Sequence, residues 1–322
     1  MNQRLLQSLR APLLATAALV GLGLGWAMPE LRDFLGTAIW PLLGLLLFVS
    51  FLEIDLEQWR RGLVDRRFLA TILILNFMVL PALVAILLLL VDLDPMLQLA
   101  VAIVLLAPCT DWFLGFNLIG GGNPERAAIA TPLLLVGQLL LVPIWLVLLP
   151  VATPEFAVPW GHLAAVFVGI LLLPLLLALA GRRLARRLRQ RERLDSASPP
   201  TALLLLMLTV LTVCAHEAPL LLSDRLRELA GPALIYVLWF PAALLCARAL
   251  GRLSGIAIPA RRTLAFSAAS RNSFLVLPFV LALPGETGLA AAAVILQSIM
   301  ELFWLILLTT VGNRWNNTHR RH

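Results

Sequence analysis

Long apolar stretches alternate with short polar breaks along the whole chain, and this pattern predicts membrane-spanning helices. A helix needs about 17–25 apolar residues to cross the hydrocarbon core of a bilayer. Stretches of about this length lie at residues 12–28, 34–52, 68–91, 96–120, 127–150, 158–180, 201–222, 231–251, 262–284 and 288–311. The pattern therefore predicts an all-α polytopic membrane protein with ten transmembrane helices.

Composition agrees with this pattern. Hydrophobic residues make up 61% of the chain and charged residues 13%, and the mean hydropathy is +0.93. These values lie outside the range of soluble globular domains. Arg4 and Arg10 precede the first apolar stretch as they would in a secretory signal, but the stretch continues to Met28 without a small-residue cleavage site. We interpret it as a retained helix.

The distribution of arginine predicts the orientation. All 25 basic residues are arginine, and with the amino terminus inside the cell twenty-one of them fall in cytoplasmic segments. Because positive residues in short loops stay on the cytoplasmic side, we expect both termini to be cytoplasmic and the protein to lie in the plasma (inner) membrane of a bacterial cell. The isoelectric point of about 11.0 follows from these arginines, so we expect membrane lipid and no nucleic acid as a partner.

The two halves of the chain match each other. The matched pairs, 159 to 161 positions apart, are Pro81-Ala82 with Pro241-Ala242, the run 107–113 with 268–274, and Gln138 and Trp145 with Gln297 and Trp304. They predict two repeats, residues 1–156 and 157–322, of five spans each. Because five is odd, the second repeat enters the membrane from the opposite side. Such a five-plus-five inverted repeat is typical of secondary transporters.

Polar residues interrupt the fourth and ninth predicted spans. Pro108 removes a backbone hydrogen bond in the middle of the fourth, and a run of serine, arginine and asparagine divides the ninth. In inverted-repeat transporters the substrate site lies at such discontinuous helices. We therefore predict that helices four and nine are discontinuous and that the substrate is bound by Cys109, Thr110, Asp111, Trp112, Arg271, Asn272 and Ser273.

Asp111 and Arg271 place opposite charges at corresponding points of the two halves. Charged side chains inside a membrane usually face the protein interior and find partners, so we expect these two to lie close together. Two roles stay open for them. The pair either serves transport or is a buried ion pair that only locks two helices.

Cys109 offers soft-ligand chemistry at the break in the fourth span. A thiolate can hold trivalent arsenic or antimony, and a single sulfur allows release. The alternative is that Cys109 is a small packing residue, which is our interpretation of Cys214 and Cys246. With three cysteines and no C-x-x-C, the sequence predicts neither a metal cage nor a disulfide framework. No cofactor is expected.

Coupling ions are expected in the fifth and tenth spans. Gln138 lies in the fifth, and Gln297 and Glu301 share one face of the tenth. An intramembrane carboxylate is a functional candidate by default, so Asp111 and Glu301 are the candidate proton carriers. For Glu301 the alternative is a structural acid whose hydrogen bonds are satisfied.

The chain carries the motifs A-P-C-T in the fourth span, G-G-G-N at its end, and S-R-N-S in the ninth span. These three motifs resemble the bile acid:sodium symporter superfamily, and within it the arsenite efflux permease branch. The resemblance implies ten helices, a panel and a core subdomain, and crossing discontinuous helices four and nine. It also implies that Cys109 acts on the metalloid. Asn272 matches the asparagine of span nine in the superfamily, and Glu301 matches the glutamate of span ten in the permeases.

The chain departs from the family at several positions, most of which bind sodium in the sodium-coupled members. The sodium-coupled members have serine and asparagine where this chain has Phe113 and Leu114, and glutamate where it has Ser267. Thr131 is the one sodium ligand that the resemblance retains. The arsenite permeases have a carboxylate near the position of Phe274. The departures favour a proton over sodium as the coupling ion.

The sequence thus predicts a secondary transporter for proton-coupled efflux of arsenite or another trivalent metalloid oxyacid. The alternative is an importer of organic anions, such as bile-acid-like compounds, sulfonates or carboxylates, by sodium or proton symport, with Arg271 binding the anion. An intramembrane enzyme is not expected, because the chain has no H-E-x-x-H motif and no deep pair of aspartates. A monomer and a homodimer both remain open.

Overall fold

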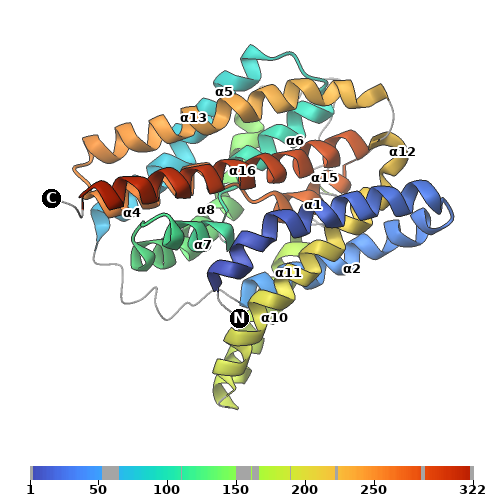
Figure 1. Cartoon of the computed structure of the whole chain (residues 1–322), viewed down its shortest axis with the longest axis horizontal. Helices are drawn as coiled ribbons and strands as arrows, with labels where there is room; N and C mark the ends of the chain where they lie inside the picture. The colour runs from blue at the N-terminus through green and yellow to red at the C-terminus, as the bar shows by residue number, and fades with distance from the viewer. Residues whose placement is uncertain are drawn as a thin grey trace. The chain divides into compact units, whose positions relative to one another are not determined.

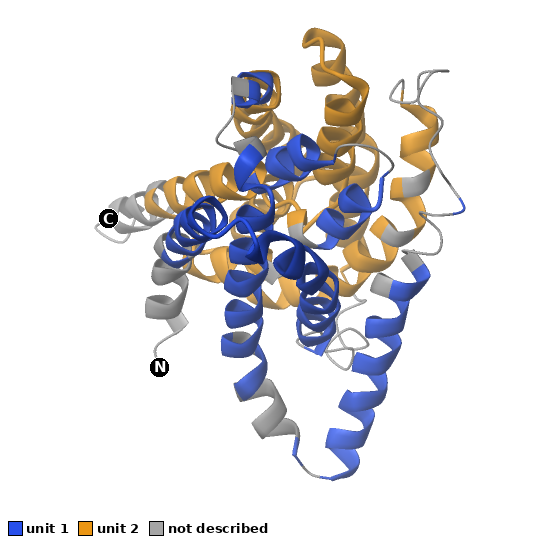
Figure 2. Ribbon diagram, turned by 90° about the vertical axis from the view of Figure 1, so that its right-hand side faces the viewer, with its two compact units in different colours: residues 1–54, 158–229, 274–295 blue, residues 55–157, 230–273, 296–322 orange. Residues whose placement is uncertain are grey.

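The computed structural model describes residues 3–52, 65–109, 111–149, 161, 167–188, 190–221, 224–283 and 287–319. Within these ranges the regular structure is helical, without a β-strand (Figure 1). The chain divides into two compact units, each built from three separate segments (Figure 2). The first unit comprises residues 1–54, 158–229 and 274–295, and the second comprises residues 55–157, 230–273 and 296–322.

The first unit is a bundle around α11 (Arg191–His216), against which both α1 (Gln3–Ala27) and α2 (Leu31–Leu52) pack. A Cβ at Gly21 would lie 2.4 Å from the carbonyl oxygen of Leu211, and one at Gly25 would lie 2.0 Å from that of Ala215. The two glycines therefore let the backbones of α1 and α11 approach closely, as small residues do between membrane helices.

The remaining helices of this unit are shorter than α1, α2 and α11. They are η2 (Phe167–Leu172), α10 (Leu173–Arg187), α12 (Ala218–Leu221) and η3 (Asp224–Leu229). The buried guanidinium of Arg182 in α10 donates to the carbonyl oxygen of Leu52, the last residue of α2. A basic side chain thereby satisfies an orphan carbonyl at a helix C-terminus.

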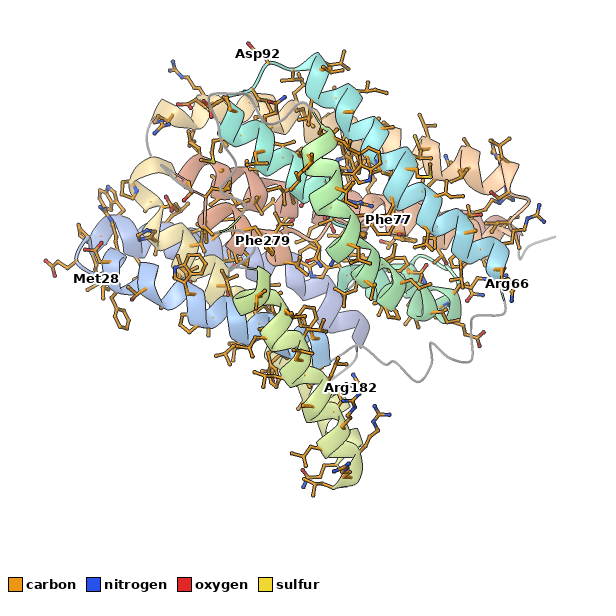
Figure 3. All side chains as sticks on the ribbon, turned by 180° about the vertical axis from the view of Figure 1, so that it is seen from behind. Met28, Arg66, Phe77, Asp92, Arg182 and Phe279 are labelled. Carbon is orange, nitrogen blue, oxygen red and sulfur yellow. The ribbon has the colours of Figure 1, made fainter. Side chains whose placement is uncertain are left out.

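The second unit begins with one long helical stretch made of three elements. They are α4 (Arg66–Ile74), the π-helical turn η1 (Leu75–Val79) and α5 (Leu80–Leu90). In Figure 3 Arg66 and Asp92 lie at opposite ends of this stretch, with Phe77 between them. The other elements are α6 (Pro95–Leu106), α7 (Asp111–Ile119), α8 (Pro124–Leu148), α13 (Ala230–Leu253) and α14 (Ile258–Ala269).

Helix starts in this unit follow local sequence. The side chain of Asp94 accepts from the backbone N–H of Met96, and that of Asn123 accepts from Arg126. A proline follows each cap residue, at the position where its missing N–H costs nothing. Two last helices, α15 (Ser273–Leu281) and α16 (Gly288–His319), each have residues in both units.

The helices agree with the predicted spans wherever these are described. Among the described residues, four helical stretches are long and apolar enough to cross a membrane, and a bent pair within α8 would make a fifth; the four are Leu31–Leu52, Arg66–Leu90, Arg225–Leu253 and Gly288–Thr310. The described structure is all-helical, and the chain is a polytopic membrane protein. Three points stay predictions: the count of ten spans, the inverted repeat, and its halves 1–156 and 157–322. The two compact units do not test the halves, because each unit combines segments from both.

Candidate functional site

Two broken helices meet inside the second unit. The fourth predicted span is divided into α6 and α7, and the ninth into α14 and α15, so both predicted breaks are present. Pro108 and Arg271 form an antiparallel β-bridge. The N–H of Cys109 donates to the carbonyl oxygen of Ser270 at 3.1 Å, and that of Asn272 donates to Ala107 at 2.8 Å. Each break thus satisfies backbone groups that the other exposes, which a buried site requires.

The side chain of Arg271 satisfies the ends of both broken helices. Its Nη1 donates to the carbonyl oxygen of Leu105 in the last turn of α6, at 3.2 Å. Its Nη2 donates to the carbonyl oxygens of Ser267 at 2.6 Å and Ala268 at 3.1 Å in the last turn of α14. Arg271 is 2% exposed. The guanidinium therefore lies where two helix C-termini carry orphan carbonyls and partial negative charge.

Asn76 and Trp239 complete the surroundings of the guanidinium. Asn76 lies in the π-helical turn η1, and its Oδ1 accepts from Nη2 of Arg271 at 2.9 Å. Its Nδ2 donates to Oγ of Ser267 at 2.9 Å and to the carbonyl oxygen of Ile72 at 3.0 Å, which fixes the amide orientation. The ring of Trp239 lies 5.4 Å from Cζ of Arg271, within the range of a cation–π contact.

Neither of these two residues was predicted from the sequence, although one signal was present. Asn76 is an amide inside a long apolar span, and polar side chains in such positions usually face the bundle interior. Trp239 carried no comparable signal, because tryptophan is common in membrane helices and its contact with Arg271 depends on tertiary packing.

A buried hydrogen-bond chain reaches the break from α16. Oε2 of Glu301 accepts from the backbone N–H of Arg271 at 2.9 Å and from Nε2 of Gln297 at 2.8 Å. Oε1 of Gln297 in turn accepts from the hydroxyl of Ser273. Glu301 is 1% exposed, and its Oε1 has no hydrogen-bond partner among the described residues. Three predicted residues thus form one hydrogen-bonded group with Arg271. They are Ser273, Gln297 and Glu301.

The other predicted residues with described side chains are buried as well. Cys109, Trp112 and Asn272 are each 5–6% exposed. Thr131 donates from Oγ1 to the carbonyl oxygen of Ala127 in its own helix, at 2.9 Å. Gln138 is 2% exposed, and its amide has no hydrogen-bond partner within the described part of the chain.

Two predicted residues fall outside this description. Thr110 lies outside the described residues, and so does the side chain of Asp111, although its backbone begins α7. The expected pairing of Asp111 with Arg271 therefore stays a prediction. In the described residues no cluster of three His, Cys, Asp or Glu side chains is positioned to hold a metal ion.

The G-G-G-N motif holds α7 and α8 against α14. A Cβ at Gly120 would lie 2.0 Å from the ring of Phe266, and one at Gly122 would lie 1.9 Å from Oδ1 of Asn117. The backbone N–H of Asn123 donates to Oγ1 of Thr263 at 2.8 Å. The motif is thus a close-packed turn that holds the α7–α8 connection against α14. Gly120 and Gly122 are glycines because a side chain at either position would collide with its neighbours.

Comparison with known proteins gives this arrangement a family. The pattern of the Sodium Bile acid symporter family matches residues 40–224, more than half of the chain. The chain belongs to the sodium bile acid symporter family. It is 26% identical over 308 aligned residues to the arsenical-resistance protein Acr3 of Corynebacterium glutamicum, an alignment that covers 88% of this chain and 82% of that protein.

Membership of the sodium bile acid symporter family confirms several predictions. The protein is a secondary transporter of the membrane and not an enzyme, as the sequence predicted. Its substrate is a small molecule, and its transport is coupled to an ion. The sequence resemblance to this family is confirmed, and the roles that it implies for Cys109, Asn272 and Glu301 stay predictions.

Proposed function

We propose that this protein exports trivalent metalloids, with arsenite as the principal substrate, across the plasma membrane in exchange for protons. One observation carries the proposal. The thiol-bearing residue Cys109 lies buried in the break between α6 and α7, held to the second break by the hydrogen bond to Ser270. The similarity to an arsenical-resistance protein supports the same substrate.

The chemistry of one thiol suits transport. The thiol of Cys109 displaces one hydroxyl group of arsenous acid as water and forms a single As–S bond, and hydrolysis reverses the step. Soft sulfur favours trivalent arsenic and antimony over hard cations. One sulfur, instead of the several that a storage site would use, allows the metalloid to leave.

The contacts of Arg271 speak against the organic-anion alternative. Both terminal nitrogens of its guanidinium donate to protein oxygens, on Leu105, Asn76, Ser267 and Ala268. Nε has no hydrogen-bond partner among the described residues, but the terminal nitrogens that a bidentate anion would use are already bonded to protein oxygens. These contacts favour a supporting role for Arg271 at the break, and a neutral oxyacid is a substrate that does not require it.

Proton coupling is supported by Glu301 and by the positions related to sodium. Glu301 is a buried carboxylate bonded to the break itself, through the N–H of Arg271. The hydroxyl of Ser267 accepts from Asn76, and Thr131 bonds within its own helix. Phe113 is fully buried and offers no oxygen ligand in its side chain. We place the exchanged proton on Glu301, with Asp111 as the second carrier.

The inverted repeat and the orientation belong to this proposal. The first unit takes residues 1–54 from the first half and 158–229 from the second, and the second unit takes 55–157 and 230–273. Equivalent segments of the two halves thus enter the same unit, which supports a five-plus-five repeat. The arginine distribution supports cytoplasmic positions for both termini.

Accumulation in everted membrane vesicles tests the proposal. Vesicles containing the protein should accumulate arsenite when an inside-acid pH gradient is imposed, with no requirement for sodium. Cys109→Ser should abolish accumulation, whereas Cys246→Ser, in α13 of the same unit, should leave it intact. Sodium-driven uptake of taurocholate without arsenite transport would reject the proposal in favour of an organic-anion carrier.

A further inference from the structure

The side chain of Arg271 lies where oxygen atoms from three helical stretches converge. Nη2 has three oxygens within 3.1 Å, on Asn76, Ser267 and Ala268, and Nη1 has one at 3.2 Å, on Leu105. Nη2 carries only two hydrogen atoms, so three acceptors exceed what separate hydrogen bonds can serve. Four oxygens thus surround the charged end of the side chain.

The positions of these oxygens explain why a cation is needed. Three of the four are carbonyls in the last turns of α6 and α14. Helix C-termini carry orphan carbonyls and partial negative charge, and here two such ends face one buried point. Water is excluded, because Ser267 and Arg271 are 1% and 2% exposed. A positive charge must therefore stabilise the two ends together.

The fourth oxygen and the aromatic ring are arranged for the same purpose. Asn76 donates from Nδ2 to the carbonyl oxygen of Ile72 and to Oγ of Ser267. These two bonds fix the amide, so that its Oδ1 points at Arg271. The ring of Trp239 covers the guanidinium at 5.4 Å, and an aromatic face attracts a cation.

We propose that these four oxygens form a monovalent-cation site whose permanent occupant is the tethered guanidinium of Arg271. The crossing of the broken helices then needs no dissolved cation in the native protein. Truncation of Arg271 to alanine leaves an empty volume at the site, and a free planar cation should bind there. Methylguanidinium is the probe, because it has the same charged group as arginine. This inference does not depend on which substrate the protein carries.

Thermal unfolding of purified variants tests the site. Arg271→Ala should lower the Tm by about 5 °C or more, and millimolar methylguanidinium chloride should restore part of the loss in a saturable way. Arg271→Met fills the volume without a charge, so its Tm should be low and should not respond to methylguanidinium. Urea at the same concentration is the solvent control, and Arg126→Ala, at a partly exposed ion pair with Asp65, is the control for loss of an arginine.

Two results would overturn the inference. A wild-type Tm and wild-type transport for Arg271→Met would show that the side chain only fills space. Equal effects of urea and methylguanidinium on Arg271→Ala would show that no cation is bound. Where neither neutral variant can be purified, Arg271→Lys decides: a charged occupant predicts a Tm that is lowered only in part and does not respond to methylguanidinium, and a Tm that rises with methylguanidinium contradicts a site that is already filled.

Discussion

Glu301 accepts a hydrogen bond from the backbone N–H of Arg271, at 2.9 Å, whereas the described bonds of the guanidinium go to Asn76 and to helix carbonyls. The two charged residues therefore act on the break in different ways. Arg271 holds the ends of α6 and α14, and Glu301 holds the extended backbone between α14 and α15. Because a carboxylate accepts more strongly than a carboxylic acid, protonation of Glu301 weakens its hold on the break.

This relationship predicts the behaviour of Glu301→Gln. Glutamine keeps an oxygen for the N–H of Arg271 but cannot ionise, so the protein should fold while proton-driven accumulation of arsenite in everted vesicles falls by about tenfold or more. A hydrogen bond contributes about 1.5–3 kcal/mol with a charged acceptor and about 0.5–1.5 kcal/mol with a neutral one, and a difference of this order accounts for a tenfold change. Glu217→Gln, at the end of α11 in the first unit, is the matched control. Unchanged accumulation driven by the pH gradient in Glu301→Gln would remove Glu301 from the coupling mechanism.

Asn76→Leu should destabilise the second unit. The change removes the donor to the hydroxyl of Ser267 and one of the oxygens around the charged Nη2 of Arg271. A hydrogen bond to a charged group contributes about 1.5–3 kcal/mol. We expect a clearly lower Tm and reduced transport. Thr71→Val in the same helical stretch provides the comparison, since the described bond of Thr71 is to Arg67 in its own helix. Equal Tm values for the two variants would contradict the proposed role of Asn76.

The sequence predicted the breaks because their signals are local. Pro108 and the polar run around Arg271 stand out in apolar spans, and the structure divides both helices there. The partners of Arg271 were not predictable in the same way. Charge complementarity indicated Asp111, whereas most of the described acceptors are backbone carbonyls, which every residue carries. Asn76 reaches Arg271 across 195 positions, through packing that no local pattern records.

Gly122→Ala tests the role of the G-G-G-N turn. The added methyl group would meet Oδ1 of Asn117, a fully buried side chain whose Nδ2 donates to Asn123. Overpacking of this kind costs about 1–3 kcal/mol, so expression and Tm should both fall. Gly44→Ala in α2 is the control, because a Cβ there meets nothing within 4 Å, and alanine favours a helix. A normal Tm for Gly122→Ala would show that the turn tolerates a side chain and that its glycines have another purpose.

Cys109→Ser should remove resistance to arsenite and to antimonite together. Serine keeps the size and hydrogen-bonding capacity of cysteine, but its oxygen is a hard ligand with little affinity for either metalloid. In a host without its own arsenite exporter, cells producing the wild type should tolerate both compounds, and cells producing Cys109→Ser should match the empty-vector control, with equal protein in the membrane.

Two comparisons make that result specific to the sulfur at the break. Cys214→Ser, at a buried position in α11 of the first unit, should retain tolerance. Arg271→Lys keeps a positive charge near the helix ends and should retain part of it, because the metalloid does not bind the guanidinium. The opposite pattern, with Cys109→Ser silent and Arg271→Lys inactive, would make Cys109 a packing residue. The planar guanidinium would then be the substrate ligand, since lysine cannot reproduce its bidentate hold on a carboxylate or sulfonate.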